Sequence, residues 1–348
     1  METQDRYLWR VLTLSNEPIN HHYLPQFYLK GFSELKRSSY RVYSYDKEHE
    51  RKVIKKSVKN ICCEKHRYTV SLDGVNDYFI EKSYSELEGI MSEVFRAKKD
   101  FVKLKLIEKK RTYWLWDRRK FIKCPEVISL DDILKIPFYG RIFNYFLSVL
   151  YWRSTVHDEY FLTKSNKSFI SSSIKKVVSG FSSDKEFSSS FGFKNTEELD
   201  CLVESVDSNT SKDSIAKIHN SLIYPLHGLF KNRAKTHELS LVYIADLNVV
   251  SSDFPFFTNE SCVNLENDFL FAMSSKLIFV NVDRKKRINI EDFSDWTFKL
   301  SMLYYLQSKR YVFSNDKELL ENVIKFANVR YGSTGINELK KELLSYFV

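Results

Sequence analysis

Two adjacent histidines, His21 and His22, stand near the start of the segment Asn20–Ser33, and imidazole is the side chain best suited to move protons near neutral pH. Consecutive side chains in an extended backbone point to opposite faces, so we expect only one ring to face a given pocket. The structural interpretation is that a histidine caps a hydrogen-bond network while neighbours such as Tyr23 and Phe27 anchor the segment. The pair therefore predicts either acid–base catalysis or a structural anchor, and both interpretations stay open.

Two carboxylates are spaced to share one face of a helix. Glu81 and Glu88 are seven residues apart, which is two helical turns, in a segment whose apolar residues recur at helical spacing. With His22 and Glu260 they could hold Mg²⁺ or Mn²⁺, which prefer oxygen ligands. A solvated acidic helix face is the other interpretation, because nothing in the spacing requires a metal. Glu81 and Glu88 are thus candidate metal ligands, and the cofactor is otherwise unknown.

A third pattern combines cations with aromatic rings. The stretch Lys103–Lys123 holds nine lysines and arginines against two acids, and the whole chain carries a net charge of +9. Cations that contact phosphates beside rings that stack on bases are typical of nucleic-acid surfaces. The structural alternative is a helix whose lysines lie over a tryptophan core. The charge favours nucleic acid as a partner, and the predicted surface consists of Lys103, Lys105, Lys109, Lys110, Arg111, Trp114, Trp116, Arg118, Arg119 and Lys120.

Several functional classes lack their signatures in this chain. It has no glycine-rich phosphate loop, no Gly-x-Ser-x-Gly elbow and no Cys-x-x-Cys pair, which disfavours ATPases, nicotinamide-dependent enzymes, α/β-hydrolases and structural zinc. Its five cysteines are scattered and odd in number, as expected for reduced thiols in a cytoplasm. No apolar run approaches the roughly 20 residues that span a bilayer. We therefore expect a cytoplasmic protein without a transmembrane segment; its oligomeric state is open.

The elements that must position these residues can be predicted from local patterns. A β-hairpin is expected over residues 40–58 with its turn at 46–50, and a long amphipathic helix over 79–95 with Asp77 as its N-cap. An apolar, buried helix is expected over 139–162. Helices that end near Pro225 and Gly228 precede a series of short strands between 239 and 284. Helices at Asp292–Gln307, at Asp316–Tyr331 and at Asn337–Phe347 follow.

These elements predict a single domain over residues 1–348, with an N-terminal hairpin part (20–70), a helical part (77–230) and a C-terminal part of strands and helices (239–348). Strands at both ends that enclose helices indicate an α+β fold. We expect it to be predominantly helical, with a small mixed or antiparallel sheet formed from N-terminal and C-terminal strands.

The same residues, in their order along the chain, resemble a bacterial family catalogued as domain of unknown function 4238. The family's hallmark is an opening His-Tyr-Val-Pro-Gln-Phe-like segment, to which HHYLPQF at His21–Phe27 is similar. Further landmarks appear in order: the strand VYSYDK, the helix IEKSYSELE that carries Glu81 and Glu88, Arg153 at the end of the apolar helix, and SKRYVFSND. The resemblance spans nearly the whole chain.

One family landmark differs in this chain. The segment FFTNESCV resembles the family's Thr-Ser-Asp-Asn-Pro-Val turn, but Glu260 replaces the aspartate and Cys262 the proline. The longer side chain would move the carboxylate by about one methylene, and positioning errors of ~1 Å can be costly in catalysis. Family members are associated with bacterial defence against phage, and this association is all the function that the resemblance implies.

The residues and the resemblance together predict an anti-phage defence effector that acts on nucleic acid as a nuclease. His22 or His21 would be the general acid or base, Glu260 its orienting or metal-binding carboxylate, and Arg153 would stabilise phosphate charge. The alternative is a non-enzymatic module that binds nucleic acid or a phage-encoded trigger through Lys103–Lys123. A toxin that modifies a host protein or nucleotide is a third class, and no residue selects it.

Overall fold

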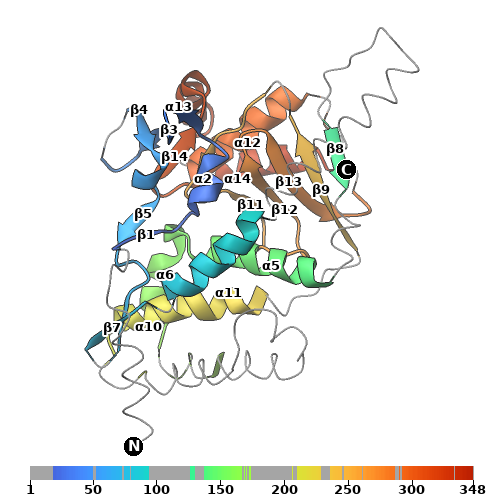
Figure 1. Ribbon diagram of the computed structural model, residues 1–348. Coiled ribbons are helices and arrows are strands. Elements are labelled where there is room, and N and C mark those ends of the chain that lie inside the picture. The colour runs from blue at the N-terminus through green and yellow to red at the C-terminus, as the bar shows by residue number, and fades with distance from the viewer. Residues whose placement is uncertain are drawn as a thin grey trace, which may run out of the picture.

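The computed structural model describes residues 19–49, 52–93, 126–129, 137–173, 206, 210–228 and 236–347, apart from positions 73, 79, 167, 169, 171, 245–246, 261, 287–289, 291 and 333. The basic stretch Lys103–Lys123 lies outside the described residues, so its nucleic-acid surface stays a prediction. Figure 1 shows two layers, with most of the strands and the C-terminal helices above and a group of helices below.

Helix and strand are mixed along the chain, and the described strands form four sheets of two to five strands. The predicted class, predominantly helical with one small sheet, is therefore wrong. The error has a local cause, because several strands are three residues long and show no period-two pattern. Four of these short strands form two antiparallel pairs, β1 (Asn20–His22) with β5 (Cys63–Lys65) and β6 (Val70–Leu72) with β7 (Val75–Asp77).

One five-stranded sheet joins early and late parts of the chain. Its central strand is β3 (Ser39–Asp46), which forms the predicted hairpin with β4 (Val53–Ser57) and a second hairpin with β2 (Glu34–Lys36). β3 also pairs antiparallel with β14 (Tyr311–Ser314), which pairs with β10 (Ser251–Ser252). Strands of the N-terminal and C-terminal parts thus meet in this sheet, although it is one sheet of four.

The other five-stranded sheet carries much of the aromatic core. Phe271 stacks on Phe256 with ring centroids 4.9 Å apart and on Tyr28 with centroids 5.5 Å apart. The Tyr28 hydroxyl donates to the Ala272 carbonyl at 2.8 Å, so the opening segment is anchored in this core. The strands, in antiparallel order, are β11 (Phe256–Thr258), β12 (Phe269–Ser274), β13 (Leu277–Asp283), β9 (His237–Tyr243) and β8 (Glu126–Ser129).

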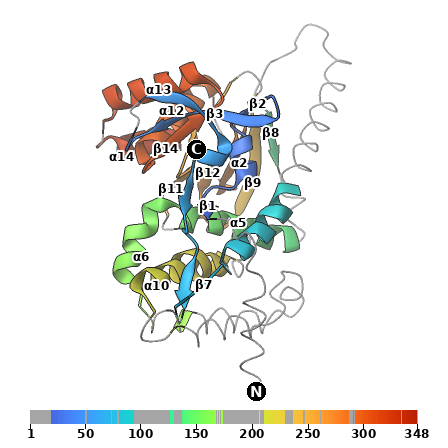
Figure 2. The ribbon, with the colours of Figure 1, turned by 60° about the vertical axis from the view of Figure 1, so that its left-hand side comes forward.

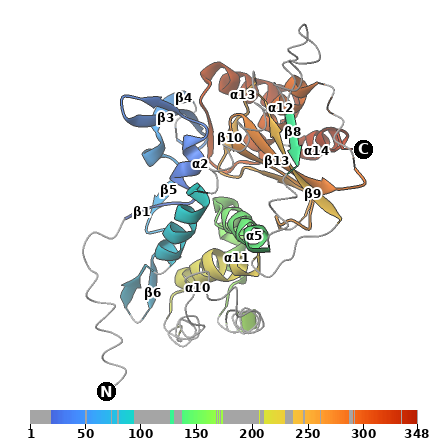
Figure 3. The ribbon, with the colours of Figure 1, turned by 45° about the vertical axis from the view of Figure 1, so that its right-hand side comes forward.

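The lower layer consists of helices (Figure 3). The helix predicted over 79–95 is helical from residue 80 to residue 93, and Asp77, expected as its cap, ends β7 instead. The layer also contains α5 (Pro137–Trp152), α6 (Asp158–Lys164), α10 (Lys212–Ile218) and α11 (Tyr224–His227).

The single helix predicted over 139–162 is wrong, because the chain breaks between α5 and α6. Ser154 has extended backbone (ψ 142°), and a 3₁₀ turn at Thr155–His157 follows it. The Ser154 hydroxyl donates to the Asp253 carbonyl at 2.9 Å, and Arg67 Nη2 donates to the Arg153 carbonyl at 2.9 Å. These partners are far away in sequence, so no local pattern could have shown the break.

A π-helical turn at His219–Ile223 joins α10 to α11. It ends two residues before Pro225, which has no N–H to donate to a regular helical ladder. Single π turns inside helices occur frequently at functional sites. The turn places Asn220 beside the cavity discussed below.

Three helices complete the described chain and lie together beside the strands in Figure 2. Two of them begin as predicted: Asp292 accepts the N–H of Ser294 and Asp295, and Asp316 accepts that of Leu319, which is the role of an N-cap residue. None of the helices that the structure describes has the length and apolar character to cross a bilayer. The three helices are α12 (Phe293–Gln307), α13 (Lys317–Arg330) and α14 (Ile336–Leu344).

Candidate functional site

His21 is fully buried and structurally engaged. Its Nδ1 accepts the backbone N–H of Tyr68 at 2.9 Å, and the two rings stack with centroids 5.7 Å apart. An acceptor at Nδ1 requires the proton of the neutral ring to sit on Nε2. His21 therefore joins β1 to the turn that follows β5, which matches the anchor interpretation of the histidine pair.

His22 points the other way and is only partly buried, as the alternation along a strand predicts. Burial lowers the pKa of His22, hydrogen bonding to the backbone at Val58 opposes that change, and the charge of Arg153 lowers the pKa further. Its Nε2 is buried and has no hydrogen-bond partner among the described residues. His22 is thus a neutral imidazole with an unused nitrogen near Arg153.

Arg153 lies in the interior with no exposed surface. Its Nη1 pairs with Glu88 Oε1 at 2.9 Å, and its guanidinium lies over the Tyr84 ring, 5.0 Å from the centroid. Burial raises the pKa of Glu88, and the neighbouring Arg153 opposes that rise. The two residues form an ion pair within the fold, and Arg153 Nε and Nη2 have no partner among the described residues.

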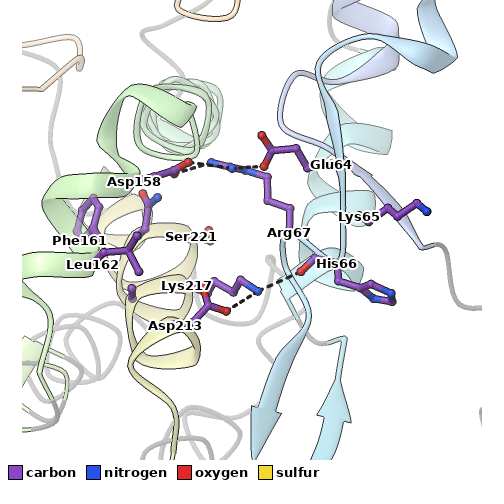
Figure 4. Close-up of a pocket in the computed structure, with 12 residues that line it drawn as sticks. Glu64, Lys65, His66, Arg67, Asp158, Phe161, Leu162, Asp213, Lys217 and Ser221 are labelled. Carbon is purple, nitrogen blue, oxygen red and sulfur yellow. Dashed lines mark hydrogen bonds and ion pairs between the residues drawn. The ribbon is translucent and has the colours of Figure 1, made fainter. Parts of the chain in front are cut away.

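Arg67 links the early strands to the lower helices (Figure 4). Its two terminal nitrogens contact both carboxylate oxygens of Asp158, at 2.7 and 3.1 Å, and Nη1 also contacts Glu64 at 2.6 Å. Such a two-point contact is the geometry in which arginine binds a carboxylate best. Sequence reasoning missed Arg67, and no spacing signal would have found it, because its partner is 91 residues away.

The predicted metal ligands do not form a cluster in the described part of the chain. Glu88 is engaged by Arg153, and the group of three nearby ligands found among the described residues is Asp46, Glu48 and His49 instead. Asp46 already accepts two hydrogen bonds from Arg310, at 3.1 Å from Nε and 3.0 Å from Nη2. That arginine supplies the positive charge that a metal would otherwise bring.

Glu260 is exposed after β11, and no hydrogen bond or ion pair links it to either histidine within the described residues. A Ser-Asp-x-Pro order, similar to the turn in the resemblance, also occurs earlier in the chain. Ser252-Asp253-Phe254-Pro255 keeps the serine, aspartate and proline of Thr-Ser-Asp-Asn-Pro at their places. Asp253 is therefore a second acid that the sequence offers at such a turn.

Asp253 is fully buried and fixes the start of β14. Its carboxylate accepts the backbone N–H groups of Lys309, Arg310 and Tyr311 at 3.1, 2.7 and 3.0 Å. Burial raises the pKa of Asp253 to about 6, and these hydrogen bonds and the charge of Lys47 hold it down. A carboxylate that accepts three backbone N–H groups has a structural role and is not free to take a proton from a substrate.

The β2–β3 hairpin has an unusual turn. Lys36 pairs with Ser39, so the turn has two residues, Arg37 and Ser38, with φ of 48° and 63°. Positive φ at both positions is the type I′ geometry that normally takes Asn-Gly. An arginine and a serine occupy it here against their backbone preference.

Three cations surround a hollow at this hairpin. Lys36, Arg37, Ser39 and Arg41 line it, and the three basic residues are exposed. None of these three cations has a carboxylate partner in the part of the chain that the structure describes. Nearby, Lys30 lies over the ring of Tyr40 at 5.1 Å, which adds a charge and an aromatic surface.

The sequence comparisons are limited to one family. Residues 20–123 match the model of a family described as "Protein of unknown function (DUF4238)". No curated protein matches the chain. No solved structure matches it either.

Proposed function

Because residues 20–123 of the chain match the DUF4238 family, whose reaction is undefined, we propose a function from the surface itself: binding of nucleic acid through the β2–β3 hairpin. The observation that carries the proposal is the cluster of Lys36, Arg37 and Arg41, three exposed cations around one hollow without carboxylate partners among the described residues. Phosphates of a nucleic-acid backbone are the polyanion that such a cluster attracts.

The turn geometry supports the same proposal. A left-handed conformation costs a non-glycine residue roughly 1–2 kcal/mol. Arg37 accepts that conformation at the tip of the hairpin, where its side chain can reach outward. Unfavourable backbone conformations that a fold retains are often found at binding sites.

The biological setting that we propose is defence against phage in the bacterial cytoplasm, and it rests on the family resemblance. Within that setting the binding module is favoured over the nuclease, because His21, Arg153 and Asp253 are each engaged in the interior. One observation favours the nuclease as a second candidate: His22 has a nitrogen without a partner in the described chain, near an arginine. Mg²⁺-dependent cleavage of RNA or DNA that is lost in His22→Ala would support that candidate.

The binding proposal is tested with a charge-neutral hairpin. Lys36→Gln, Arg37→Gln and Arg41→Gln together remove three positive charges and leave the strands in place. We measure the affinity for a fluorescent RNA strand and a DNA duplex by anisotropy between about 50 and 200 mM salt. If all three residues contact phosphates, the slope of log affinity against log salt should fall by about 2 to 3.

The matched control removes the same charge elsewhere. Lys212, Lys317 and Lys325 are exposed lysines on α10 and α13, and changing all three to glutamine should leave most of the affinity and slope intact. Equal losses in the two triple variants would mean that net charge alone drives binding. No measurable binding by the unmodified protein would reject the proposal.

A further inference from the structure

A separate cavity of about 250 Å³ lies between the turn after β5 and helices α6 and α10. Figure 4 shows Glu64 and Arg67 on one side, Asp158 and Leu162 on the other, and Lys217 below. Ligand pockets for drug-sized molecules usually run from about 300 to 1,000 Å³, so this cavity suits a smaller molecule or a single ring system.

Two cations at this cavity, Lys217 and Arg67, are already engaged, and the side chain of Lys65 points away from both in Figure 4. Lys217 Nζ contacts Asp213 Oδ2 at 2.8 Å and donates to the carbonyls of His66 and Thr69 at 3.2 and 3.3 Å. Arg67 uses both terminal nitrogens on Asp158, Glu64 and a backbone carbonyl, and its Nε is buried without a partner among the described residues. A phosphate would therefore meet the amine of Lys217 and the terminal nitrogens of Arg67 already occupied, while three carboxylates line the same cavity.

Further hydrogen-bonding capacity at the cavity belongs to an amide and to carboxylates. Asn220 lines the cavity, is 5% exposed, and has a buried Oδ1 without a partner among the described residues. It projects from the π-helical turn, where the widened helix places it beside the cavity. Glu64 and Asp213 are more exposed and keep lone pairs for further donors, with side-chain exposures of 38% and 61%. Leaving a buried amide oxygen unpaired is unfavourable, so a partner for it is expected.

From this arrangement we propose that the cavity binds an amino-bearing nucleobase, with adenine the best match. The amide of Asn220 offers one acceptor and one donor in a plane, which is the pair that asparagine uses to contact the amino group and ring nitrogen of adenine. Glu64 or Asp213 accepts the remaining amino hydrogen, and Phe161, Leu162 and Ala216 supply apolar surface for the ring. The base is either that of a free nucleoside or an unstacked base of a strand.

The test compares adenosine with inosine, which carries an oxygen where adenosine has its amino group. We measure the binding of each nucleoside to the full chain by calorimetry. A site that pairs with an amino group should bind inosine at least about tenfold more weakly. Equal binding of adenosine and inosine, or no binding of adenosine, would overturn the proposal unless the oligonucleotide experiment described next shows binding of an adenine within a strand.

An oligonucleotide experiment distinguishes a free nucleoside from an unstacked base of a strand as the source of the base. A short oligonucleotide with one adenine is compared with the same strand abasic at that position. If only the adenine strand binds, and its advantage is lost in Asn220→Leu, the ligand is an unstacked base; if adenosine alone also binds, a free nucleoside suffices. Failure of both experiments overturns the proposal.

Variants tie the binding to the cavity. Asn220→Leu removes both amide groups at similar size and should abolish the preference for adenosine over inosine. Asn315→Leu is the matched control, because Asn315 also has a buried Oδ1 without a partner in the described chain but does not line the cavity. Should Asn220→Leu unfold the protein, Ala216→Leu fills the cavity from α10 and is expected to give the same loss. Retention of adenosine binding in a folded Asn220→Leu or Ala216→Leu variant would overturn the assignment.

This inference does not depend on the hairpin. The variant that neutralises Lys36, Arg37 and Arg41 should bind adenosine as the unmodified protein does, because none of these residues lines the cavity. Nucleic-acid binding through the hairpin and base binding in the cavity can therefore fail separately.

Discussion

The interior around Arg153 and the surface around Arg37 use the same kind of side chain in opposite ways. In the interior the guanidinium of Arg153 has no exposed surface and is held by Glu88 and the face of Tyr84. At the hairpin Arg37 is exposed, and it has no carboxylate partner among the described residues. A buried charge must be paired to be tolerated, whereas an exposed cation without a partner is available to another molecule.

The histidines show the same contrast within one strand. His21 faces the packed interior and accepts a backbone N–H, while His22 faces the other side with a nitrogen to spare. A histidine or arginine can therefore be assigned a structural role, or a role in binding a ligand, only when its partners in the fold are known. Four predictions test these roles, beginning with the largest expected effect.

Breaking the interior pair should be the most damaging change. Arg153→Met leaves Glu88 without its partner, and loss of one member of a buried pair typically costs about 3–5 kcal/mol of the free energy of unfolding. Urea unfolding followed by circular dichroism measures the loss. The double variant Arg153→Met with Glu88→Met should regain much of it; a single variant that loses under about 1 kcal/mol would show that the pair is not a buried one.

The interior should also respond to acid through His157. Its ring lies 4.7 Å from Tyr151 and 5.0 Å from Trp152, and burial lowers the pKa of His157 from 6.5 to about 4. The unfolded chain then binds a proton more readily than the folded one, so this contribution to stability is present above pH 6.5 and is lost as pH falls towards 4. His157→Phe should reduce the fall in unfolding free energy over that range by about 1–3 kcal/mol, measured by urea titrations at several pH values. An unchanged pH profile would contradict the assignment.

At the β2–β3 hairpin, a residue that prefers the observed backbone conformation should raise the free energy of unfolding, by less than the interior changes lower it. Ser38→Gly places glycine where φ is 63°, which a type I′ turn favours, and should raise the unfolding free energy by about 0.5–1 kcal/mol. Thermal unfolding detects the gain. Because Lys36, Arg37 and Arg41 are unchanged, nucleic-acid affinity should be kept; a fall in affinity would indicate that the strained turn itself is part of the site.

The smallest effect is expected at Glu260. This residue is exposed, and the described structure links it to neither histidine, so Glu260→Ala should change the unfolding free energy by no more than about 0.5 kcal/mol and leave nucleic-acid binding unaltered. Calorimetry and anisotropy give the two values. A large loss of any activity that the protein proves to have would restore Glu260 as a candidate.

Sequence patterns predicted the elements whose signals are local. The β3–β4 hairpin and the strands β9, β12 and β13 depend on local runs of β-branched and aromatic residues. The caps Asp292 and Asp316 depend on a single residue beside its own helix. The pairing of β1 with β5 and the break after Trp152 depend on distant partners, such as Arg67 for the Arg153 carbonyl, and could not be predicted in this way.

The residues of the candidate site also differ in how far the sequence could predict them. The histidine pair and Arg153 were singled out as candidate catalytic residues, but their residue types could not show that Tyr68 would engage His21 or that Glu88 would engage Arg153. Asp253 could have been found, since the Ser-Asp-x-Pro order is present at Ser252–Pro255. Asn220 carries no sequence signal, because its importance lies in a π-helical turn and in a cavity shared by three segments.

The pairing of β3 with β14 constrains how the chain can be made. Arg310 and Asp46, which bond across this junction, are 264 residues apart, so a ribosome has translated most of the chain before β3 meets this neighbour. Contacts between such distant residues form slowly, and unpaired strand edges are prone to aggregate in the meantime. Production of the protein should therefore benefit from slower synthesis at low temperature or from chaperones that shield β3 until β14 emerges.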